Sequence, residues 1–474
     1  MAVDETKVAA IVEAVLQRLR EEGGGRVGAP AVISRRAETG SLGIHADIDS
    51  AVKAAWEAHQ RLVAMPLEVR DKAIQAMRDL TVGRAPELAR MAVEETGLGR
   101  VEDKIQKNHL AALKTPGTEI LVPRAFTGDR GLTLAERAPY GVICSITPCT
   151  NATETIINNA IGMVAGGNGV VINGHPSAKG TIATFIRWLN EAIVQAGGPD
   201  NLICTIPEPT IESANTVMRH PGTALVVVTG GPAVVKAAMS TGKKCIAAGP
   251  GNPPALVDET AKLDQAARDL IAGASLDNNI VCIVEKEILA VEAIADRLKQ
   301  ELVRAGAYLV RDSQVGRLTQ VLVDGDHPNK RFVGKNPSVI LREIGIQVPD
   351  EVRLAFFEAD ESHPLVQIEQ LLPVLPFVRV KNVEEGIAAA LRIEHGYRHT
   401  AVMHSLNVER LHRYARAANT SIFVKNAPSF AGLGLQGEGY TSWTIASPTG
   451  EGLTTALNFT RERRCVLKDY FRIV

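Results

Sequence analysis

The sequence is poor in aromatic residues and has no marked excess of either charge. Aromatic side chains make up 4% of the 474 residues, and the formal net charge is −1. A balanced charge argues against nucleic acid or an anionic membrane surface as a partner. Apolar runs of roughly 18 residues are lacking, so the sequence predicts no membrane-spanning helix. Abundant glycine, alanine and valine instead favour an α/β fold over a sandwich or barrel.

The six cysteines show no pattern that predicts a disulfide framework or a metal site. They are scattered along the chain, with no C-x-x-C pair and no ligand spacing to histidine. This usage predicts a reducing, cytoplasmic environment. The N-terminus lacks an uninterrupted apolar segment and carries Asp4 and Glu5, which argues against a signal or transit peptide.

The first 22 residues combine one apolar stripe with a mixed polar face. From Val8 to Leu19 apolar residues recur at the spacing of one helix face, and three glycines from Gly23 favour a helix end. Residues 23–41 have the composition of a flexible linker. The helix is expected either to pack on the main domain or an oligomer neighbour, or to dock into a groove of a partner.

The remainder of the chain predicts helices first and then alternating strands and helices. Residues 46–115 are helix-rich, and residues 121–139 alternate around a Gly-Asp-Arg-Gly turn that predicts a hairpin. Short apolar runs then alternate with helical patterns, which predicts two α/β domains with parallel strands, the first ending near Gly249. The predicted strands are 141–146, 169–172, 202–206, 224–228, 281–284, 374–380, 400–403 and 421–425.

Two glycine-rich segments are candidates for a nucleotide site. Thr229, Gly230 and Gly231 follow a buried strand and open a helix, so backbone N–H groups and the positive end of the helix dipole would face a phosphate. Such turns also occur without a ligand. Residues 432–437 (GLGLQG) match the dinucleotide fingerprint, but loop residues separate them from the preceding strand and no helix is predicted to follow. They favour a loop on the substrate side.

Another predicted strand ends at Ile146, Thr147 and Pro148. The carboxyl ends of parallel strands are where open α/β sheets bind ligands. Asn151 follows, and its amide can donate to a developing oxyanion. The alternative role for Asn151 is an Asx turn that caps the helix beginning near Thr153.

Three further residues are candidates for catalysis, each with an ordinary alternative. Cys282 lies where a polar turn leads into an apolar run, although free cysteines are commonly buried fillers. Cys465 follows two arginines that would lower its pKa, but it lies near the chain end in a predicted edge strand. His363 lies in a loop and is either a base or a capping or exposed residue.

Several of these segments together resemble the aldehyde dehydrogenase superfamily, in order and in spacing. The resemblance extends over nearly the whole chain and is closest to the coenzyme-A-acylating branch, which includes acetaldehyde and propionaldehyde dehydrogenases of bacterial microcompartments. The matching stretches are 94–104 (EETGLGRVEDK), 147–161 (TPCTNATETIINNAI), 228–231, 247–254 (AAGPGNPP), 275–286 (SLDNNIVCIVEK) and 446–452 (ASPTGEG).

The resemblance implies a Rossmann-type cofactor domain, an α/β catalytic domain and β elements for oligomerisation. The cofactor domain would comprise residues 42–119 and 138–248, and the catalytic domain residues 249–454. Residues 120–137 and 455–474 would form the hairpin and strand that assemble a homodimer or homotetramer.

The N-terminal helix then has a more specific interpretation. Microcompartment enzymes of this kind carry a tethered encapsulation-type helix, so residues 1–22 are expected to bind shell or cargo proteins. The expected location is cytoplasmic, within a microcompartment, and no nucleic acid or membrane partner is expected.

The family also implies a role for each site residue. Cys282 matches the nucleophile, Asn151 the oxyanion-hole amide, and Glu369 the carboxylate that holds the nicotinamide ribose. His363 is retained as a candidate base. The expected cofactor contacts are Ile146, Thr147, Pro148, His175, Pro176, Thr229, Gly230, Gly231 and Glu369.

Two departures from the family pattern bear on the chemistry. Hydrolytic members carry a Glu-Leu-Gly-Gly motif whose glutamate activates water, and Ala247-Ala248-Gly249-Pro250 occupies that place. Without this base, coenzyme A is the expected acyl acceptor. Where typical members have Lys-Pro-Ser-Glu to hold the adenosine ribose, this chain has residues 175–178 (HPSA). NAD is the expected cofactor, with NADP left open.

The expected reaction is the reversible conversion of acetaldehyde or propionaldehyde, NAD and coenzyme A to acyl-CoA and NADH through a thioester on Cys282. Two alternatives are an acyl-phosphate reductase of the same superfamily and a non-catalytic scaffold for shell cargo. A scaffold would not need Cys282, Asn151 and Glu369 together, which favours the enzyme.

Overall fold

The computed structural model describes residues 42–474. The predicted amphipathic helix 1–22 and the linker 23–41 lie outside the described residues. The described part of the chain contains two parallel sheets, each with helices on its faces, and a separate three-stranded antiparallel sheet. The predicted α/β class is therefore confirmed. None of the described helices is both long enough and apolar enough to cross a membrane.

The first parallel sheet has the strand order β5-β4-β3-β6-β7. Its strands are β3 (Val142–Ile146), β4 (Gly169–Asn173), β5 (Ile203–Cys204), β6 (Thr223–Thr229) and β7 (Cys245–Ala248). The chain runs outward from β3 to β5 and then returns to the other side of β3. The strand order therefore reverses between β3 and β6, and ligands of open α/β sheets bind at such a switch point.

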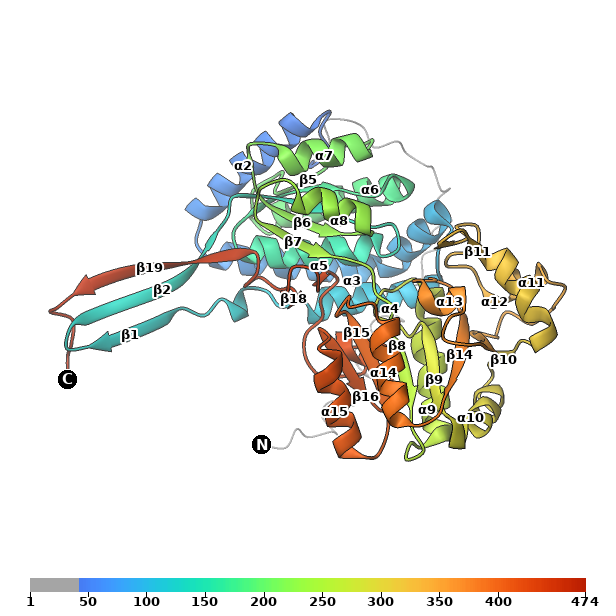
Figure 1. Cartoon of the computed structure of the whole chain (residues 1–474). Helices are drawn as coiled ribbons and strands as arrows, with labels where there is room; N and C mark the ends of the chain where they lie inside the picture. Colours follow the sequence, from blue (N-terminus) through green and yellow to red (C-terminus); the bar gives the residue numbers. More distant parts are fainter. Residues whose placement is uncertain (1–41) are drawn as a thin grey trace, which may run out of the picture. The chain divides into compact units, whose positions relative to one another are not determined.

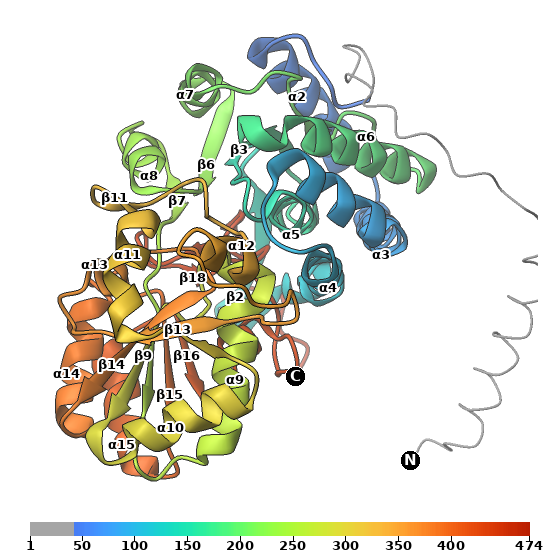
Figure 2. The same ribbon diagram turned by 90° about the vertical axis from the view of Figure 1, so that its right-hand side faces the viewer.

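Helices cover both faces of this sheet. They are α2 (Ile48–Ala64), α3 (Glu68–Thr96), α4 (Val101–Lys114), α5 (Ala152–Ala165), α6 (Lys179–Gln195), α7 (Ile211–Arg219) and α8 (Pro232–Met239). Figure 2 shows α7 and α8 on one side of β6 and α3, α5 and α6 on the other. In β6 the side chains alternate accordingly: Val226 and Val228 pack in the cluster with α2, α7 and α8, whereas Leu225 and Val227 pack with α3, α5 and α6. Burial on both faces explains the continuous apolar run.

The second parallel sheet has the order β10-β13-β14-β9-β8-β15-β16. Its strands are β8 (Pro254–Val257), β9 (Glu287–Val291), β10 (Tyr308–Leu309), β13 (Ala355–Glu358), β14 (Val374–Val380), β15 (Thr400–His404) and β16 (Ile422–Lys425). Its main helices are α9 (Leu263–Ser275), α10 (Glu292–Arg304), α14 (Val383–Ile393) and α15 (Val408–Ala418).

Short elements connect the strands and helices of the two parallel sheets. They are α11 (Asp312–Leu322), α12 (Pro337–Arg342), α13 (Pro364–Gln367), β11 (Val323–Asp324), β12 (His327–Pro328), β17 (Ile445–Ala446), β18 (Gly452–Leu453) and the 3₁₀ helices η1 (Thr118–Ile120), η2 (Pro176–Ala178), η3 (Leu276–Asn279) and η4 (Ser429–Leu433). The glycine-rich residues 432–437 lie at the end of η4 and in the turn after it, so the fingerprint there is not followed by a helix.

The strand predicted at residues 281–284 is wrong. These residues form turns, and β9 begins later, at Glu287. The physical reason lies just before the turn, where Asp277, Asn278 and Asn279 have φ values of 50°, 54° and 70°. Three successive residues in the left-handed region turn the chain sharply, so the apolar run that follows packs in the core as a turn.

The predicted hairpin is confirmed. β1 (Arg124–Gly128) pairs antiparallel with β2 (Gly131–Pro139), and β19 (Thr460–Lys468) pairs with the other edge of β2. Figure 1 shows these three strands extending away from the two parallel sheets. Phe126, Val466 and Leu467 are exposed there.

Candidate active site

A cavity of about 580 Å³ lies where the carboxyl ends of β3, β4, β6 and β7 face the turn that contains Cys282. Eleven of the twelve residues expected at the site line it: Ile146, Thr147, Pro148, Asn151, His175, Pro176, Thr229, Gly230, Gly231, Cys282 and Glu369. The cavity also contacts Cys149, Ala248, Ile280, Leu371 and Trp443. Residues that lie more than 200 positions apart in the sequence thus line the same cavity.

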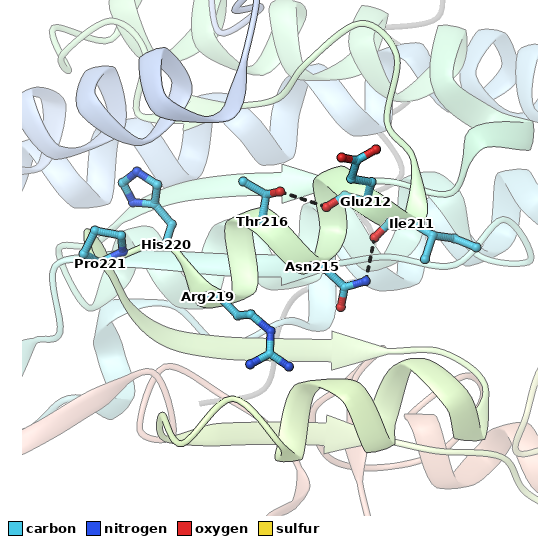
Figure 3. Close-up of a pocket in the computed structure, with 7 residues that line it drawn as sticks. All are labelled: Ile211, Glu212, Asn215, Thr216, Arg219, His220 and Pro221. Carbon is cyan, nitrogen blue, oxygen red and sulfur yellow. Dashed lines mark hydrogen bonds between the residues drawn. The ribbon is translucent and has the colours of Figure 1, made fainter.

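The cavity continues outward along helices α7 and α8. Ala214 and Met218 line it from α7, and Val234 and Ala237 from α8. A separate open hollow along α7, shown in Figure 3, shares Ile211 and Asn215 with this cavity. Its Thr216 and Asn215 side chains donate to backbone carbonyls of the same helix, so they are already engaged locally.

The turn that carries Cys282 is held by amide side chains. Asn278 Nδ2 donates to the carbonyl of Gly334 at 2.9 Å, and Asn279 Nδ2 donates to the carbonyls of Ala274 and Glu285 at 2.8 and 2.9 Å. Asparagine tolerates the left-handed region better than most residues. These bonds replace the strand ladder that the sequence predicts here.

Lys286 closes the same turn from the other side. Its buried Nζ donates to the backbone oxygen of Asn279 at 2.8 Å, to the Asn279 side-chain oxygen at 2.7 Å and to the carbonyl of Val281 at 3.3 Å. Burial lowers the pKa of the Lys286 ammonium to about 8, against the opposing effect of Glu369. A cation therefore lies directly behind the turn.

The Cys282 thiol is protonated at neutral pH in this arrangement. Burial, and after it the charge of Glu369, raises the pKa of the thiol to about 12, although the ammonium groups of Lys286 and Lys107 act in the opposite direction. Because the thiolate is the nucleophile, reaction requires a proton acceptor. Glu369 lines the same cavity, and burial raises the pKa of its carboxyl. Its Oε1 accepts a hydrogen bond from the Gly251 N–H at 3.2 Å.

The capping role considered for Asn151 is not what the structure shows. Asn151 occupies the N-cap position of α5, yet among the described residues its side chain makes no cap hydrogen bond. Its Nδ2 makes a long contact of 3.4 Å with Thr150 Oγ1, and its buried Oδ1 has no partner within residues 42–474. Because Nδ2 carries two N–H groups and makes only this one long contact, it can donate to a developing negative charge on oxygen in the cavity.

The turn after β6 has the features expected of a phosphate site. Gly231 is the N-cap of α8, and Pro232 occupies the first helical turn. A Cβ added at Gly231 would meet nothing within 4 Å, so the backbone there is open to the cavity. Thr229 Oγ1 is hydrogen-bonded to Thr444 Oγ1 at 2.8 Å, which fixes the start of the turn.

His175 lies at the far end of the cofactor side. Its Nδ1 accepts a hydrogen bond from the Ser177 N–H at 3.2 Å and caps η2. Burial lowers the pKa of its ring, so the side chain is neutral at pH 7. Ala178 is buried beside it. This corner thus presents a neutral ring where the family pattern has a lysine and a glutamate.

His363 is not part of the cavity. Its Nδ1 accepts from the Leu365 N–H at 3.2 Å as the N-cap of α13, and its Nε2 is 2.9 Å from Thr319 Oγ1. Both ring nitrogens are thus engaged in local structure. The capping interpretation accounts for His363, and it has no place in the reaction proposed below. The rival thiol, Cys465, is exposed on β19 and does not line the cavity either.

The structure shows which of residues 247 and 248 faces the site, where the glutamate of hydrolytic members is missing. Ala247, the residue expected to mark it, is fully buried in the core cluster with α2, α7 and α8. Ala248, its neighbour on β7, lines the cavity. Side chains alternate along a strand, so a carboxylate would reach the site from position 248.

Sequence reasoning missed His399 as a neighbour of the nucleophile. The backbone at Gly251 separates the two: a Cβ built on Gly251 would lie 2.8 Å from the Cys282 carbonyl oxygen and 3.0 Å from His399 Cγ. Burial lowers the pKa of His399 to about 4, so its ring is neutral. A single histidine before a strand gives no signal in the sequence. No cluster of three or more potential metal ligands occurs within residues 42–474.

Comparisons with known proteins show the family to which the chain belongs. Residues 31–321 match the model of the aldehyde dehydrogenase family. The acetaldehyde dehydrogenase (acetylating) of Salmonella typhimurium is 49% identical over 440 residues, covering 91% of this chain and 94% of that protein.

Two solved structures are similar over about nine tenths of this chain. A Rhodopseudomonas palustris propionaldehyde dehydrogenase with bound CoA and an acylated cysteine is 47% identical, with a TM-score of 0.89 over 90% of this chain and 98% of that one. A propionaldehyde dehydrogenase from the fucose-utilisation bacterial microcompartment of Clostridium phytofermentans is 48% identical, with a TM-score of 0.90 over 91% and 100%.

Proposed function

The chain belongs to the aldehyde dehydrogenase family, and we propose that it oxidises acetaldehyde or propionaldehyde to the coenzyme A thioester with NAD as the hydride acceptor. One observation carries the proposal: Cys282 and an Asn151 amide that makes no cap hydrogen bond line one cavity, whose wall has Ala248 where a hydrolytic enzyme needs a carboxylate. The names of its relatives support the acylating outcome.

In the first half-reaction Cys282 loses its proton and adds to the aldehyde carbonyl carbon. Glu369 is the acceptor that the cavity offers for that proton, in addition to the ribose contact that the family implies. The Asn151 amide donates to the resulting oxyanion, an interaction worth about 3 kcal/mol for one such donor. The carbonyl re-forms as hydride passes to the nicotinamide, which leaves a thioester on Cys282 and gives NADH.

In the second half-reaction the acyl group moves from Cys282 to coenzyme A. The ionised thiol of coenzyme A adds to the thioester carbonyl, and Cys282 leaves as the thiolate and recovers a proton. A thiolate needs no general base to be a strong nucleophile, whereas water does. The alanine at position 248 therefore favours coenzyme A over water. One thioester replaces another, so the step runs in both directions.

The cofactor would occupy the cavity from Cys282 to the groove between α7 and α8. The loop at Ile146, Thr147 and Pro148 and the turn at residues 229–231 would contact it, the latter through the N-terminus of α8 at the phosphates. His175 and Pro176 would meet the adenosine end. A neutral histidine there neither repels nor pairs with a 2′-phosphate, and NAD is assigned from the acylating branch.

The test is NADH formation from acetaldehyde or propionaldehyde, with and without coenzyme A. We expect turnover that depends on coenzyme A, and none from Cys282→Ala in either direction. Equal NADH formation without coenzyme A, or wild-type turnover by the variant, would reject the assignment.

The same family membership supports a proposal for assembly and location. Residues 1–22 would act as an encapsulation helix that recruits the enzyme to a microcompartment, and the sheet β1-β2-β19, with Phe126, Val466 and Leu467 exposed, would assemble a homodimer or homotetramer. Residues 42–119 and 138–248 would bind the cofactor and residues 249–454 would supply the nucleophile. Deleting residues 1–22 should abolish recruitment to shells and leave catalysis intact; loss of catalysis with normal recruitment would reverse this view.

A further inference from the structure

We propose that Lys104 and Lys107 are positioning residues that fix the nucleophile turn relative to the oxyanion amide. The proposal rests on the function proposed above, because it assigns these lysines to the step in which Cys282 and Asn151 act on one carbonyl. Both lysines come from helix α4, which contributes no residue to the cavity lining.

Each ammonium group bridges the two sides of the site. Lys104 Nζ is 2.8 Å from Asp277 Oδ2 and 3.1 Å from the carbonyl oxygen of Thr150. Lys107 Nζ is 2.5 Å from the same Asp277 oxygen and 3.2 Å from Glu154 Oε1. Asp277 begins the left-handed segment that leads to Cys282, whereas Thr150 and Glu154 flank Asn151 in sequence. Four contacts thus connect the nucleophile turn to the segment that carries the amide.

The bridge is fully buried. The side chains of Lys104, Lys107, Asp277 and Glu154 are at most 1% exposed. Burial alone would lower the pKa of Lys107, but Asp277 and Glu154 together raise it, and Lys104 and Lys107 lower the pKa of Asp277 against burial. Lys107 and Asp277 therefore remain charged in the interior as an ion pair. Buried ion pairs add little net stability compared with apolar side chains of the same size. A role in fixing geometry explains their presence better.

Asp277 makes further hydrogen bonds through its other carboxylate oxygen and its backbone N–H. Its Oδ1 accepts from the Arg100 N–H at 2.7 Å, and its own N–H donates to Asp103 Oδ2 at 2.9 Å. Its φ of 50° is a backbone conformation that residues other than glycine rarely adopt. Such a conformation persists where the surroundings over-determine it, and the two lysines are part of those surroundings.

Lys107 also acts on the pKa of the nucleophile and lies close to Trp443, another residue of the cavity lining. Its charge lowers the pKa of the Cys282 thiol, against burial and Glu369. Its Nζ lies 5.4 Å from the ring centroid of Trp443, which lines the cavity. Removing this charge should move the turn, raise the thiol pKa and loosen the tryptophan, while the residues that contact the aldehyde and cofactor remain.

The test uses variants that keep the buried charge balanced. Removing Lys107 alone would leave a buried carboxylate unpaired and risks misfolding, so Lys107→Met is combined with Glu154→Gln. Lys107→Arg is the conservative variant, and Lys72→Met, on exposed α3 surface, is the matched control. Each protein is checked for its melting temperature before assay.

We expect the Lys107→Met/Glu154→Gln enzyme to fold, to lose about a hundredfold in kcat and to keep its KM for aldehyde within a few-fold. The pH at which Cys282 reacts with iodoacetamide should rise relative to wild type and the Lys72→Met control, and Lys107→Arg should recover part of both losses. A folded double variant with wild-type kcat and an unshifted alkylation profile would overturn the proposal.

The two levels of proposal fail differently. Alkylation of Cys282 is measured without aldehyde, NAD or coenzyme A, so its pH profile tests the lysine bridge even if the enzyme proves not to acylate coenzyme A. Conversely, coenzyme-A-dependent NADH formation by wild type tests the reaction whatever the lysine variants do.

Discussion

The Lys286 ammonium is hydrogen-bonded to both oxygens of Asn279, at 2.8 Å to the backbone and 2.7 Å to the side chain. Asn279 is the last of three left-handed residues, and Cys282 follows three positions later. The Lys286 ammonium therefore stabilises the left-handed turn that precedes Cys282. Lys286 opposes the rise in the pKa of the thiol that burial causes, but it does not cancel it.

The reactivity of Cys282 should increase with pH over a wide range. Its thiol has a pKa of about 12, so well below that pH the thiolate fraction, and with it the alkylation rate, rises about tenfold per pH unit. Iodoacetamide labelling of the unliganded enzyme between pH 7 and 10, quantified peptide by peptide, measures this slope. Cys465, exposed on β19, provides the comparison within the same sample. A Cys282 rate that is already constant with pH near 7 would contradict the assigned pKa.

Replacing Asn151 should slow the chemistry more than it weakens binding. In Asn151→Ala the oxyanion loses one preorganised donor, and kcat should fall by about 10²- to 10³-fold. The KM for aldehyde should change little, because the carbonyl carries full negative charge after Cys282 has added. Steady-state kinetics with both aldehydes measures the changes in kcat and in KM separately. Asn158→Ala, which removes a buried asparagine from the same helix, controls for loss of packing. An Asn151→Ala loss confined to KM would contradict the oxyanion role.

A carboxylate at position 248 should open a hydrolytic route. Ala248 faces the cavity, so in Ala248→Glu a general base would lie where water can reach the thioester, and NADH should form from aldehyde without coenzyme A. Ala247→Glu is the matched control. Its side chain would enter the apolar core, so it should lower the melting temperature and give no hydrolysis. Hydrolysis by the 247 variant and none by the 248 variant would reverse the assignment of the two positions.

His404, buried at the end of β15, predicts a pH-dependent contribution to stability. Burial lowers the pKa of His404 to about 4, so between pH 6.5 and 4 the unfolded chain binds a proton at this residue and the native chain does not. The free energy of unfolding therefore falls as the pH falls through this window, by about 1.4 kcal/mol per pH unit for one histidine, and levels off below 4.

Urea unfolding of wild type and His404→Asn at pH 7, 6 and 5 measures this contribution. The variant should lose less stability on acidification than wild type, whereas His412→Asn, on an exposed position of α15, should follow wild type. Parallel curves for wild type and His404→Asn would show that the buried ring does not titrate as described.

The sequence predicts elements well where local pattern and tertiary environment agree. The run 374–380 coincides with β14, because a strand buried on both faces is apolar along most of its length, here with Arg379 as the one partly exposed residue. The run 281–284 is also apolar, yet it forms a turn, since the conformation there is imposed by the hydrogen bond of Asn278 to the distant Gly334 carbonyl and by that of Lys286 to Asn279. No local periodicity encodes such contacts.

The candidate site follows the same division. Cys282, Asn151 and Glu369 are expected from their motifs, and the structure brings them to one cavity. Lys104 and Lys107 gave no such signal, because two lysines spaced by three residues on a helix usually belong to a solvated face. Here they are buried, and only the packing of α4 against the nucleophile turn makes this visible.

The most direct test of the central claim is the mass of the intact enzyme after reaction with aldehyde and NAD in the absence of coenzyme A. We predict that wild type gains one acyl group, mapped to Cys282, and that adding coenzyme A removes it within one turnover while water alone removes it slowly. An enzyme that turns over without acylation at Cys282, or whose acyl group is lost to water as fast as to coenzyme A, would contradict the account.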